Sequence, residues 1–355
     1  MKKINFIFKA LLLTSVLFLA SCSDDNEQGP KGDYENGVLI TGEGSGAGSA
    51  TISFVSNDYT TVESKIYSKV NGVDLGTFLQ SMTFNGDTGY IVVDNQNTVT
   101  VVNRYTFEKQ GEISTGLQVP RFMAIAGNKG YITNWGAGSF GDNIDDDFVA
   151  VVDLTTLQVT SKINVVVGPE QIVYQNGKMF VSHKGGYGSN NKITVIDTTT
   201  DTVEKVIDVK DKPDELGFKT NGNLIVLAGG NEAWTGNETA GAIITINTNT
   251  LEVDSEVVFA DGVHPSLMYV ADNNIYYNVG NDVFEMSETA TTLPTTKLVT
   301  GATGFLYGIA VKDAKLYALD ASFTDISKMN VFNVTTKEEL KTVDAPLGAS
   351  KVYFN

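Results

Sequence analysis

The sequence predicts an all-β fold, a seven-bladed β-propeller of four-stranded antiparallel blades in which the C-terminal strand closes the ring. Three observations support this prediction. A β-rich unit recurs seven times, each copy ends at a residue suited to start a tight turn, and the last seven residues form the strand that the first copy lacks. The composition fits, because 35 glycines and only 7 prolines accompany 42% hydrophobic residues in a chain of 355.

The first residues predict export and lipid attachment. A basic start precedes an apolar run over 10–20, which is shorter than the roughly 20 apolar residues of a membrane-spanning helix. Such a run is typical of a secretory signal. It ends in LASC at Cys22, where small residues precede a cysteine that can be acylated. We expect residues 1–21 to be a lipoprotein signal peptide and Cys22 to carry the lipid. The alternative is an ordinary signal in which Cys22 has no role.

Residues 22–36 are polar and acidic and predict a flexible tether. The Ser-Asp-Asp after Cys22 resembles the acidic export signal of surface lipoproteins in the Bacteroidetes. We therefore expect a lipid-anchored outer-membrane protein that faces the cell exterior, with the periplasmic face as the alternative. The formal net charge of −17 disfavours nucleic acid and anionic headgroups, so contact with the membrane is expected through the lipid alone.

The propeller domain is predicted over 37–355. Seven residues end the recurring strand and can hydrogen-bond the backbone two positions on: Ser56, Asn103, Asp153, Asp197, Asn247, Ser287 and Asn333. A strand precedes each copy. An outer strand follows, as at 62–70, 159–167 and 203–209, and an inner strand comes before later units, as at 120–126, 169–175 and 265–271. Four strands in each 40–50 residues is the period of propeller blades.

The two ends of the domain predict how the ring closes. The first unit lacks its innermost strand, and residues 349–355 (ASKVYFN) supply a strand of the right kind. Because a closed ring leaves only short, protected strand edges, we expect the C-terminal strand to complete the first blade and the protein to be monomeric.

The repeat also carries a family resemblance. VIDTTTDTV (195–203) and YITNW (131–135) resemble the repeat of YncE-like and surface-layer propellers. With the LASC motif, the acidic tether and the segments at 120–135 and 42–54, the chain resembles the DUF5074-type propeller lipoproteins of Bacteroidetes, a group that includes BtuG-type cobalamin-capturing proteins. The resemblance implies capture of a ligand beside a TonB-dependent transporter. It assigns no ligand-contacting residues, so a cobalamin-like macrocycle and other oligomers are both candidates.

Propeller geometry places the loops between the second and third strands on the same face as the connections between blades. Many of these loops are long, and long loops on a rigid scaffold often carry function. Candidate ligand-binding residues there are Trp135, Trp234, Phe140, Tyr187, His183, Arg121, His264, Tyr307 and Phe323. Exposed aromatic residues are costly unless they cover or bind something. We expect a ligand- or partner-binding face, with packing of the loops on each other as the alternative.

Few residues point to cofactor or metal chemistry. An acidic run can supply oxygen ligands to calcium, but it lacks EF-hand spacing, which favours a solvated loop. The calcium candidates are Asp142, Asp145, Asp146 and Asp147. Three glycines at 136, 138 and 141 match a dinucleotide-binding pattern, but no helix follows and the acidic run would repel a pyrophosphate. We expect no other cofactor and no nucleic-acid partner.

The sequence favours a binding protein over an enzyme. G-x-S-x-G and H-E-x-x-H motifs are absent, and two histidines cannot form a three-histidine zinc site. Paired carboxylates remain open to hydrolase chemistry. We expect a non-enzymatic surface lipoprotein that captures a nutrient for a TonB-dependent outer-membrane transporter, with Arg121 and His183 orienting the ligand. The second hypothesis is a protein-interaction or adhesion propeller, and the third is a propeller hydrolase or lyase.

Overall fold

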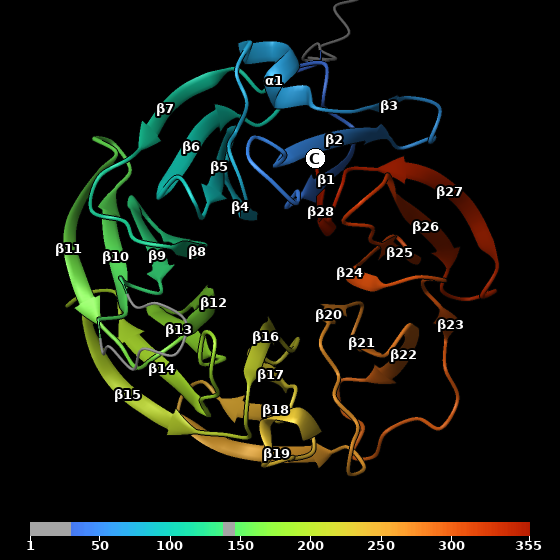
Figure 1. The fold of residues 1–355 in the computed structure, drawn as a ribbon. Helices are drawn as coiled ribbons and strands as arrows, with labels where there is room; N and C mark the ends of the chain where they lie inside the picture. The colour runs from blue at the N-terminus through green and yellow to red at the C-terminus, as the bar shows by residue number, and fades with distance from the viewer. Residues whose placement is uncertain (1–29, 138–145) are drawn as a thin grey trace, which may run out of the picture.

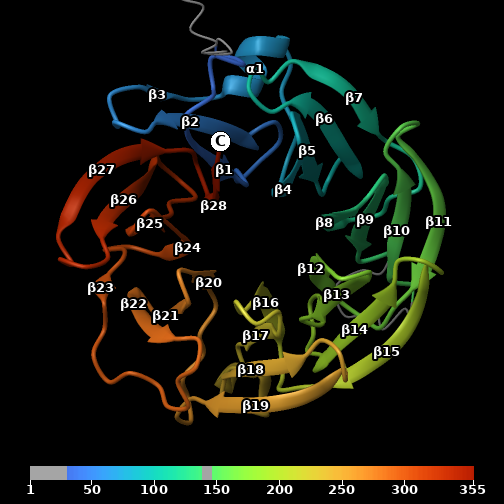
Figure 2. The same ribbon diagram turned by 180° about the vertical axis from the view of Figure 1, so that it is seen from behind.

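The structure is a computed structural model that describes residues 30–137 and 146–355. Within these residues, seven four-stranded antiparallel sheets are arranged in a ring, as Figure 1 and the reverse view in Figure 2 show. The predicted seven-bladed β-propeller is confirmed. Several predicted features lie outside the described residues: the signal peptide 1–21, the lipidated Cys22, most of the tether, and Phe140, Asp142 and Asp145.

Each blade runs from an innermost strand A to an outermost strand D, and blade 1 contains both ends of the propeller. From blade 1 to blade 7, the A strands are β28 (Ala349–Phe354), β4 (Leu79–Asn85), β8 (Pro120–Ala126), β12 (Pro169–Gln175), β16 (Pro213–Phe218), β20 (Met268–Ala271) and β24 (Leu306–Lys312). The B strands are β1 (Gly37–Gly42), β5 (Thr88–Val93), β9 (Lys129–Asn134), β13 (Lys178–His183), β17 (Leu224–Ala228), β21 (Asn274–Val279) and β25 (Lys315–Asp320).

The outer half of each blade follows the same order. The C strands are β2 (Thr51–Ser56), β6 (Thr98–Asn103), β10 (Phe148–Asp153), β14 (Lys192–Asp197), β18 (Ala242–Asn247), β22 (Asp282–Ser287) and β26 (Ser327–Asn333). The D strands are β3 (Val62–Glu63), β7 (Lys109–Ile113), β11 (Gln158–Asn164), β15 (Thr202–Asp208), β19 (Glu252–Val258), β23 (Val299–Thr300) and β27 (Glu339–Ala345). The described helices are α1 (Ile66–Asn71) and the short 3-10 helix η1 (Ala233–Thr235).

The C-terminal strand closes the ring as predicted. β28 pairs antiparallel with β1, from Val38 opposite Phe354 to Gly42 opposite Ala349, and becomes the innermost strand of blade 1. It also reaches blade 2, because the Arg104 guanidinium donates to the Phe354 carbonyl at 3.0 Å. The two ends of the chain therefore form one sheet that is tied to its neighbour.

The seven turn residues end the seven C strands. Six of them accept the backbone N–H of the residue two positions on: Asn103, Asp153, Asp197, Asn247, Ser287 and Asn333. Ser56 differs, since its hydroxyl accepts the N–H of Thr61 at 3.0 Å and donates to Asp58. One short polar side chain at the end of each C strand thus fixes the turn into strand D.

The prediction of an outer strand over 62–70 is wrong for most of that range. β3 covers only Val62–Glu63, and α1 follows. Neighbouring residues of a strand point to opposite faces, yet Ile66 and Tyr67 are both buried in the cluster between blades 1 and 2, where Phe54 also lies. A helical turn allows both to face that cluster. It ends at Gly72, whose φ of +71° suits a glycine.

The inner strand of blade 6 is shorter than the predicted 265–271, because β20 begins at Met268. The side-chain oxygen of Asn278 accepts the backbone N–H groups of Ser266 at 2.9 Å and Leu267 at 2.8 Å. An asparagine side chain therefore replaces the sheet ladder at the start of this strand.

The hydrophobic core lies between neighbouring blades. The cluster between blades 1 and 2 includes Leu39, Ile52 and Ile91, and the one between blades 7 and 1 includes Ile40 and Val331. Since both faces of each sheet are covered in this way, the B and C strands are buried along most of their length. Among the described residues, no helix has the length and apolar character of a membrane-spanning segment.

Candidate functional site

The innermost strands line a central cavity of about 490 Å³ whose polarity changes along the axis. Mostly polar residues, with the ring of Phe122, lie where the A strands begin: Ser81, Gln171, Glu215, Ser350 and Lys351. Apolar residues follow: Met82, Met123, Ile172, Leu216, Met268, Ile309 and Val352. Aromatic residues line the far end: Phe84, Phe218, Tyr269 and Phe354. The polar end, which we call the channel mouth, opens on the face of the B–C loops.

β-Bulges shape the channel mouth. In blades 3, 4 and 5, the pairing of the A and B strands shifts at the dipeptides 121–122, 170–171 and 214–215. Two A-strand residues there oppose one B-strand residue, so the strand bends and its side chains are re-aimed. Similar shifts occur at the starts of the inner strands of blades 1, 2 and 7, at Ser350, Gln80 and Tyr307. Bulges are common next to functional sites, which makes this end of the channel the candidate site.

Side-chain hydroxyls hold the bulges together. The N–H groups of Phe122 and Gln171 donate to Thr133 at 3.0 Å and to Ser182 at 3.1 Å. The same two hydroxyls donate onward, each at 2.8 Å, to the backbone carbonyls of Glu170 and Asp214 in the next blade. Each hydroxyl accepts a backbone N–H of its own blade and donates to a backbone carbonyl of the next blade. The mouth is therefore a preorganised polar network.

Arg121 lies in the first bulge with its charge compensated. Its guanidinium contacts Asp94 at 2.8 Å and Glu170 at 2.8 Å, and all three side chains are largely buried. Burial raises the pKa of the Asp94 carboxyl, and Arg121 opposes that effect. Burial lowers the pKa of Arg121 while the two carboxylates raise it, and the net direction is upward. Arg121 therefore stays charged, with its strongest donors already engaged.

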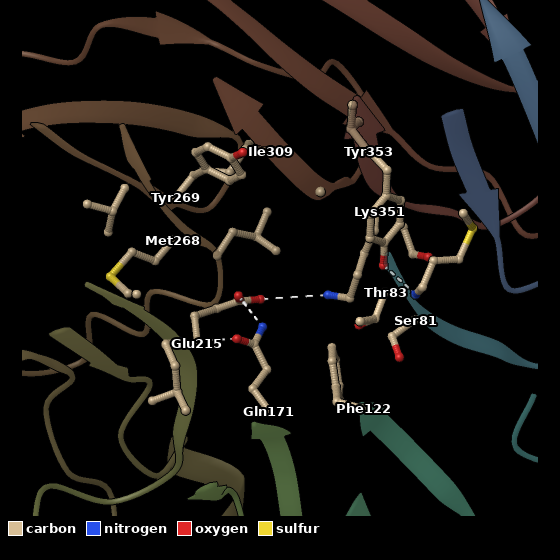
Figure 3. A pocket seen from close by; sticks show the side chains of 18 of the residues that line it. Ser81, Thr83, Phe122, Gln171, Glu215, Met268, Tyr269, Ile309, Lys351 and Tyr353 are labelled. Atoms are coloured by element: carbon tan, nitrogen blue, oxygen red, sulfur yellow. Dashed lines mark hydrogen bonds and ion pairs between the residues drawn. The ribbon is translucent and has the colours of Figure 1, made fainter. Parts of the chain in front are cut away.

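A second set of charges lies deeper. Lys351 and Glu215 point toward each other across the channel with 3.9 Å between nitrogen and oxygen, and Gln171 donates to Glu215 (Figure 3). Beside them, Lys184 pairs with Asp214 at 2.5 Å. Burial raises the pKa of Glu215, and Lys351 counteracts it. Burial lowers the pKa of Lys351 and Glu215 raises it, with a net upward shift.

Glu43 completes the mouth beside blade 7. It follows β1, and its carboxylate accepts the Tyr307 hydroxyl at 3.2 and 3.3 Å. Burial raises the pKa of Glu43, and burial with the nearby Glu43 charge raises the pKa of Tyr307 to about 12. The Tyr307 ring stacks on Phe305 at 5.2 Å and meets the edge of Phe323 at 5.5 Å. Tyr307 thus links the Glu43 carboxylate to two further aromatic rings.

The two tryptophans have different environments. Trp135 covers the Arg121 guanidinium at 4.0 Å and donates from its indole nitrogen to the Pro169 carbonyl at 2.9 Å. Tyr187, 58% exposed, meets the edge of the Trp135 ring at 5.3 Å. Trp234 lies on η1 and is 78% exposed, with the Lys212 ammonium 5.2 Å from its ring. Trp135 packs within the mouth, whereas Trp234 projects from a loop.

The two histidines also differ. His183 ends β13, is fully buried, and neither ring nitrogen has a hydrogen-bond partner in the described chain. Burial lowers its pKa to about 3, although backbone groups of Val166 and Val167 favour the charged form. His264 is partly buried between the Gly229 carbonyl at 3.0 Å and Glu238 at 3.3 Å. His183 thus presents no group to solvent, and His264 lies in a loop.

The calcium candidates are only partly described. Asp146 accepts the N–H of Ala137 at 2.7 Å, and the buried Asp147 accepts that of Gly168 at 2.5 Å. Both carboxylates therefore hold backbone of the loop. In residues 30–137 and 146–355, no group of three or more His, Cys, Asp or Glu side chains is arranged to hold a metal ion.

The structure brings together three of the predicted site residues around the mouth charges, Arg121, Trp135 and Tyr307, with Tyr187 and Phe323 packed against them. The sequence alone does not point to the other charged residues of the mouth: Glu43, Asp94, Glu170, Lys184, Asp214, Glu215 and Lys351. A signal for part of this set was present. Three inner strands begin with proline followed by a pair that includes a charged residue, at 120–122, 169–171 and 213–215.

The fold and this mouth define a seven-bladed propeller with one preorganised polar site at the axis. The chain belongs to the family described as Domain of unknown function (DUF5074), whose model matches residues 36–345. No curated protein matches the chain.

Several solved structures share the fold. A quinonprotein alcohol dehydrogenase-like protein from Bacteroides thetaiotaomicron VPI-5482 is 14% identical, with a TM-score of 0.67 over 90% of this chain and 78% of that one. The computationally designed Ika8 protein is 11% identical, with a TM-score of 0.59 over 92% of both chains. The dihydro-heme d1 dehydrogenase NirN is 13% identical, with a TM-score of 0.57 over 91% of this chain and 76% of that one. At these identities the likeness concerns the fold alone.

Proposed function

We propose that this propeller is a non-enzymatic binding protein that captures a small ligand at its channel mouth. The observation that carries the proposal is the set of bulges at one end of the inner strands, which gathers polar and charged side chains beside aromatic residues. Buried polar groups fixed by hydrogen bonds, next to apolar surface, are the usual makeup of a ligand site. Since the network is already formed, little ordering is needed when a ligand binds.

The cellular role in this proposal is nutrient capture at the bacterial surface. Lipid on Cys22 would anchor the protein in the outer membrane, the acidic tether would let the propeller extend outward, and the mouth would pass its ligand to a TonB-dependent transporter. The LASC motif and the resemblance to propeller lipoproteins support this role. A cobalamin-like macrocycle and other oligomers are the ligands to test first.

Recovery of the native ligand tests the binding function. The full chain, purified from its own host, is analysed by mass spectrometry for bound small molecules. Phe305→Ala combined with Tyr187→Ala, which removes two rings that are each more than half exposed, should lose the ligand. Tyr174→Ala is the matched control, because Tyr174 is a 41% exposed aromatic residue near the opposite end of an inner strand. Equal recovery from the double variant and the control would reject the mouth as the site.

Localisation has a separate test. Cys22→Ser should move the protein from the outer-membrane fraction to the soluble fraction. In the unchanged protein, protease added to whole cells should remove the propeller if it faces outward and should spare it if it faces the periplasm. Retention of Cys22→Ser in the membrane would contradict the lipid anchor.

Trp234 favours a second candidate, a protein-interaction or adhesion propeller. A tryptophan that is 78% exposed on a loop is typical of residues that anchor a protein partner. If Trp234→Ala abolishes binding to host or partner proteins while the small-molecule fraction is unchanged, this second function replaces the first.

The third candidate is a hydrolase or lyase. His183 is a poor general base because it is buried with a pKa of about 3. An enzyme in this channel would instead use Glu215, whose raised pKa suits an acid–base role. Turnover of a substrate by the full chain, lost in Glu215→Gln, would establish this alternative.

A further inference from the structure

Glu43 is fixed at the mouth by its backbone. Its N–H donates to the Gly348 carbonyl at 3.0 Å, and its own carbonyl accepts the N–H of Phe78 at 3.1 Å. These bonds hold the residue between the closing turn of the ring and blade 2. The backbone that carries the carboxylate is therefore held on both sides by hydrogen bonds.

The Glu43 carboxylate has little compensation for its charge. Its hydrogen bond from Tyr307, at 3.2–3.3 Å, is long for a bond between two oxygens. No lysine, arginine or histidine nitrogen of the described residues lies within the 4.0 Å of an ion pair. Arg121 and Lys351 act on it only at longer range, and each already has a carboxylate partner. A partly buried carboxylate without a cation partner is costly, so a positively charged ligand group would be stabilised beside it.

The net charge of the whole mouth also favours a positively charged ligand group. Five carboxylates gather there against three cations. The carboxylates are Glu43, Asp94, Glu170, Asp214 and Glu215, and the cations are Arg121, Lys184 and Lys351. A concave site with an excess of negative charge attracts a cationic ligand group and repels an anionic one.

The aromatic residues beside Glu43 determine the kind of cation. Phe305 is 51% exposed and Phe323 is 38% exposed, and both pack on Tyr307. The Phe323 ring also lies against the turn that holds Glu43, because a Cβ at Gly348 would meet it at 3.0 Å. Aromatic faces attract ammonium and guanidinium groups, whereas hard metal ions require several oxygen ligands. The cluster thus suits an organic cation and does not suit a metal ion.

We propose that Glu43, Tyr307, Phe305 and Phe323 bind the ammonium or guanidinium group of an organic ligand. This inference rests on the proposed ligand-binding function and specifies the chemistry of its ligand. The carboxylate supplies the counter-charge, the rings replace the water around the cation, and the remainder of the ligand lies over the mouth.

Two matched pairs of probes test the proposal with the full chain in detergent. Choline is compared with 3,3-dimethylbutan-1-ol, its neutral analogue of the same shape, and benzylammonium with benzyl alcohol. Isothermal titration calorimetry at low salt should show each cation binding at least about tenfold more tightly than its neutral partner. Glu43→Gln should abolish that preference. Glu108→Gln, an exposed carboxylate in a C–D turn of blade 2, is the control and should leave the preference unchanged.

The outcomes separate the two proposals. Equal affinity for cation and neutral analogue would overturn the cation site while leaving ligand capture intact. Failure of both cations to bind would also overturn the cation site, whereas ligand capture is judged by what co-purifies from the host. Preference retained in Glu43→Gln, with that variant folded by circular dichroism, would remove Glu43 from the site. Tyr307→Phe keeps the ring and should retain most of the preference, which distinguishes ring contact from the hydroxyl bond.

Discussion

Lys351 and Glu215 face each other across the channel axis, 3.9 Å apart, although 136 positions separate them in the sequence. Lys351 comes from β28, the strand that closes blade 1, and Glu215 comes from a bulge in blade 5. The last residues of the chain therefore both complete the ring and supply a cation to its channel. Closure of the fold and assembly of the mouth are coupled through one strand.

The first prediction concerns this pair. Lys351→Met should lower the free energy of unfolding, because Glu215 then faces the channel without its cation. The loss should be smaller than the ~3–5 kcal/mol of a fully buried pair, since both side chains keep some contact with solvent. Urea unfolding of Lys351→Met, Glu215→Gln and the double variant gives the coupling energy, which should be at least about 0.5 kcal/mol. Strictly additive losses would show that the two charges do not interact.

The second prediction concerns ring closure. Deletion of 349–355 removes the innermost strand of blade 1 and exposes the edge of β1, so the shortened protein should aggregate or lose its cooperative thermal transition. Tyr353→Phe is the mild comparison. It removes only the hydroxyl that accepts the Met82 N–H at 2.8 Å and should cost about 1–3 kcal/mol. A deletion variant that melts like the full chain would contradict the closed ring.

The sequence predicts the fold better than the site, and particular residues show why. The turn residue at the end of each C strand acts through its neighbours, so Asn247 or Asp197 can be recognised from a short pattern. A bulge depends on how two strands pair, so it cannot be predicted from one short stretch of sequence. Glu215 and Lys351 meet only after seven blades close, so neither was recognisable alone. The sequence identifies Trp135 as an aromatic loop residue, but its packing on the Arg121 guanidinium depends on the bulge that re-aims that side chain.

The third prediction concerns acid stability. His183 has a pKa of about 3 in the folded protein and an ordinary value of 6.5 when unfolded. The unfolded chain therefore binds the extra proton first as pH falls below that ordinary value, and the free energy of unfolding decreases. The loss should be about 2 kcal/mol between about pH 7.5 and about pH 5, because the free energy of unfolding falls by about 1.36 kcal/mol per pH unit once the imidazole of the unfolded chain is protonated. The stability is recovered as pH rises again.

His183→Leu tests this assignment, because leucine fills the buried site without a titrating group. Its free energy of unfolding, measured by urea at several pH values, should change less over this range than that of the unchanged protein. His264→Gln is the control, because it removes the other histidine of the sequence, which lies in a loop and is not fully buried. If His183→Leu keeps the full acid loss, other groups cause it.

The fourth prediction separates the two tryptophans. Trp135→Phe removes the indole hydrogen bond to the Pro169 carbonyl and part of the cover over Arg121, so it should cost about 1 kcal/mol of unfolding free energy. Trp234→Ala should stay within about 0.5 kcal/mol of the unchanged protein, because the ring is largely exposed and the Lys212 ammonium lies 5.2 Å from its centroid. Urea unfolding measures both.

The sequence predicts the same binding role for both tryptophans, whereas the structure indicates a different role for each. Trp135 maintains the geometry of Arg121 at the mouth. If Trp234→Ala changes binding without changing stability, Trp234 is a contact residue. A loss of stability in Trp234→Ala equal to that in Trp135→Phe would contradict this division.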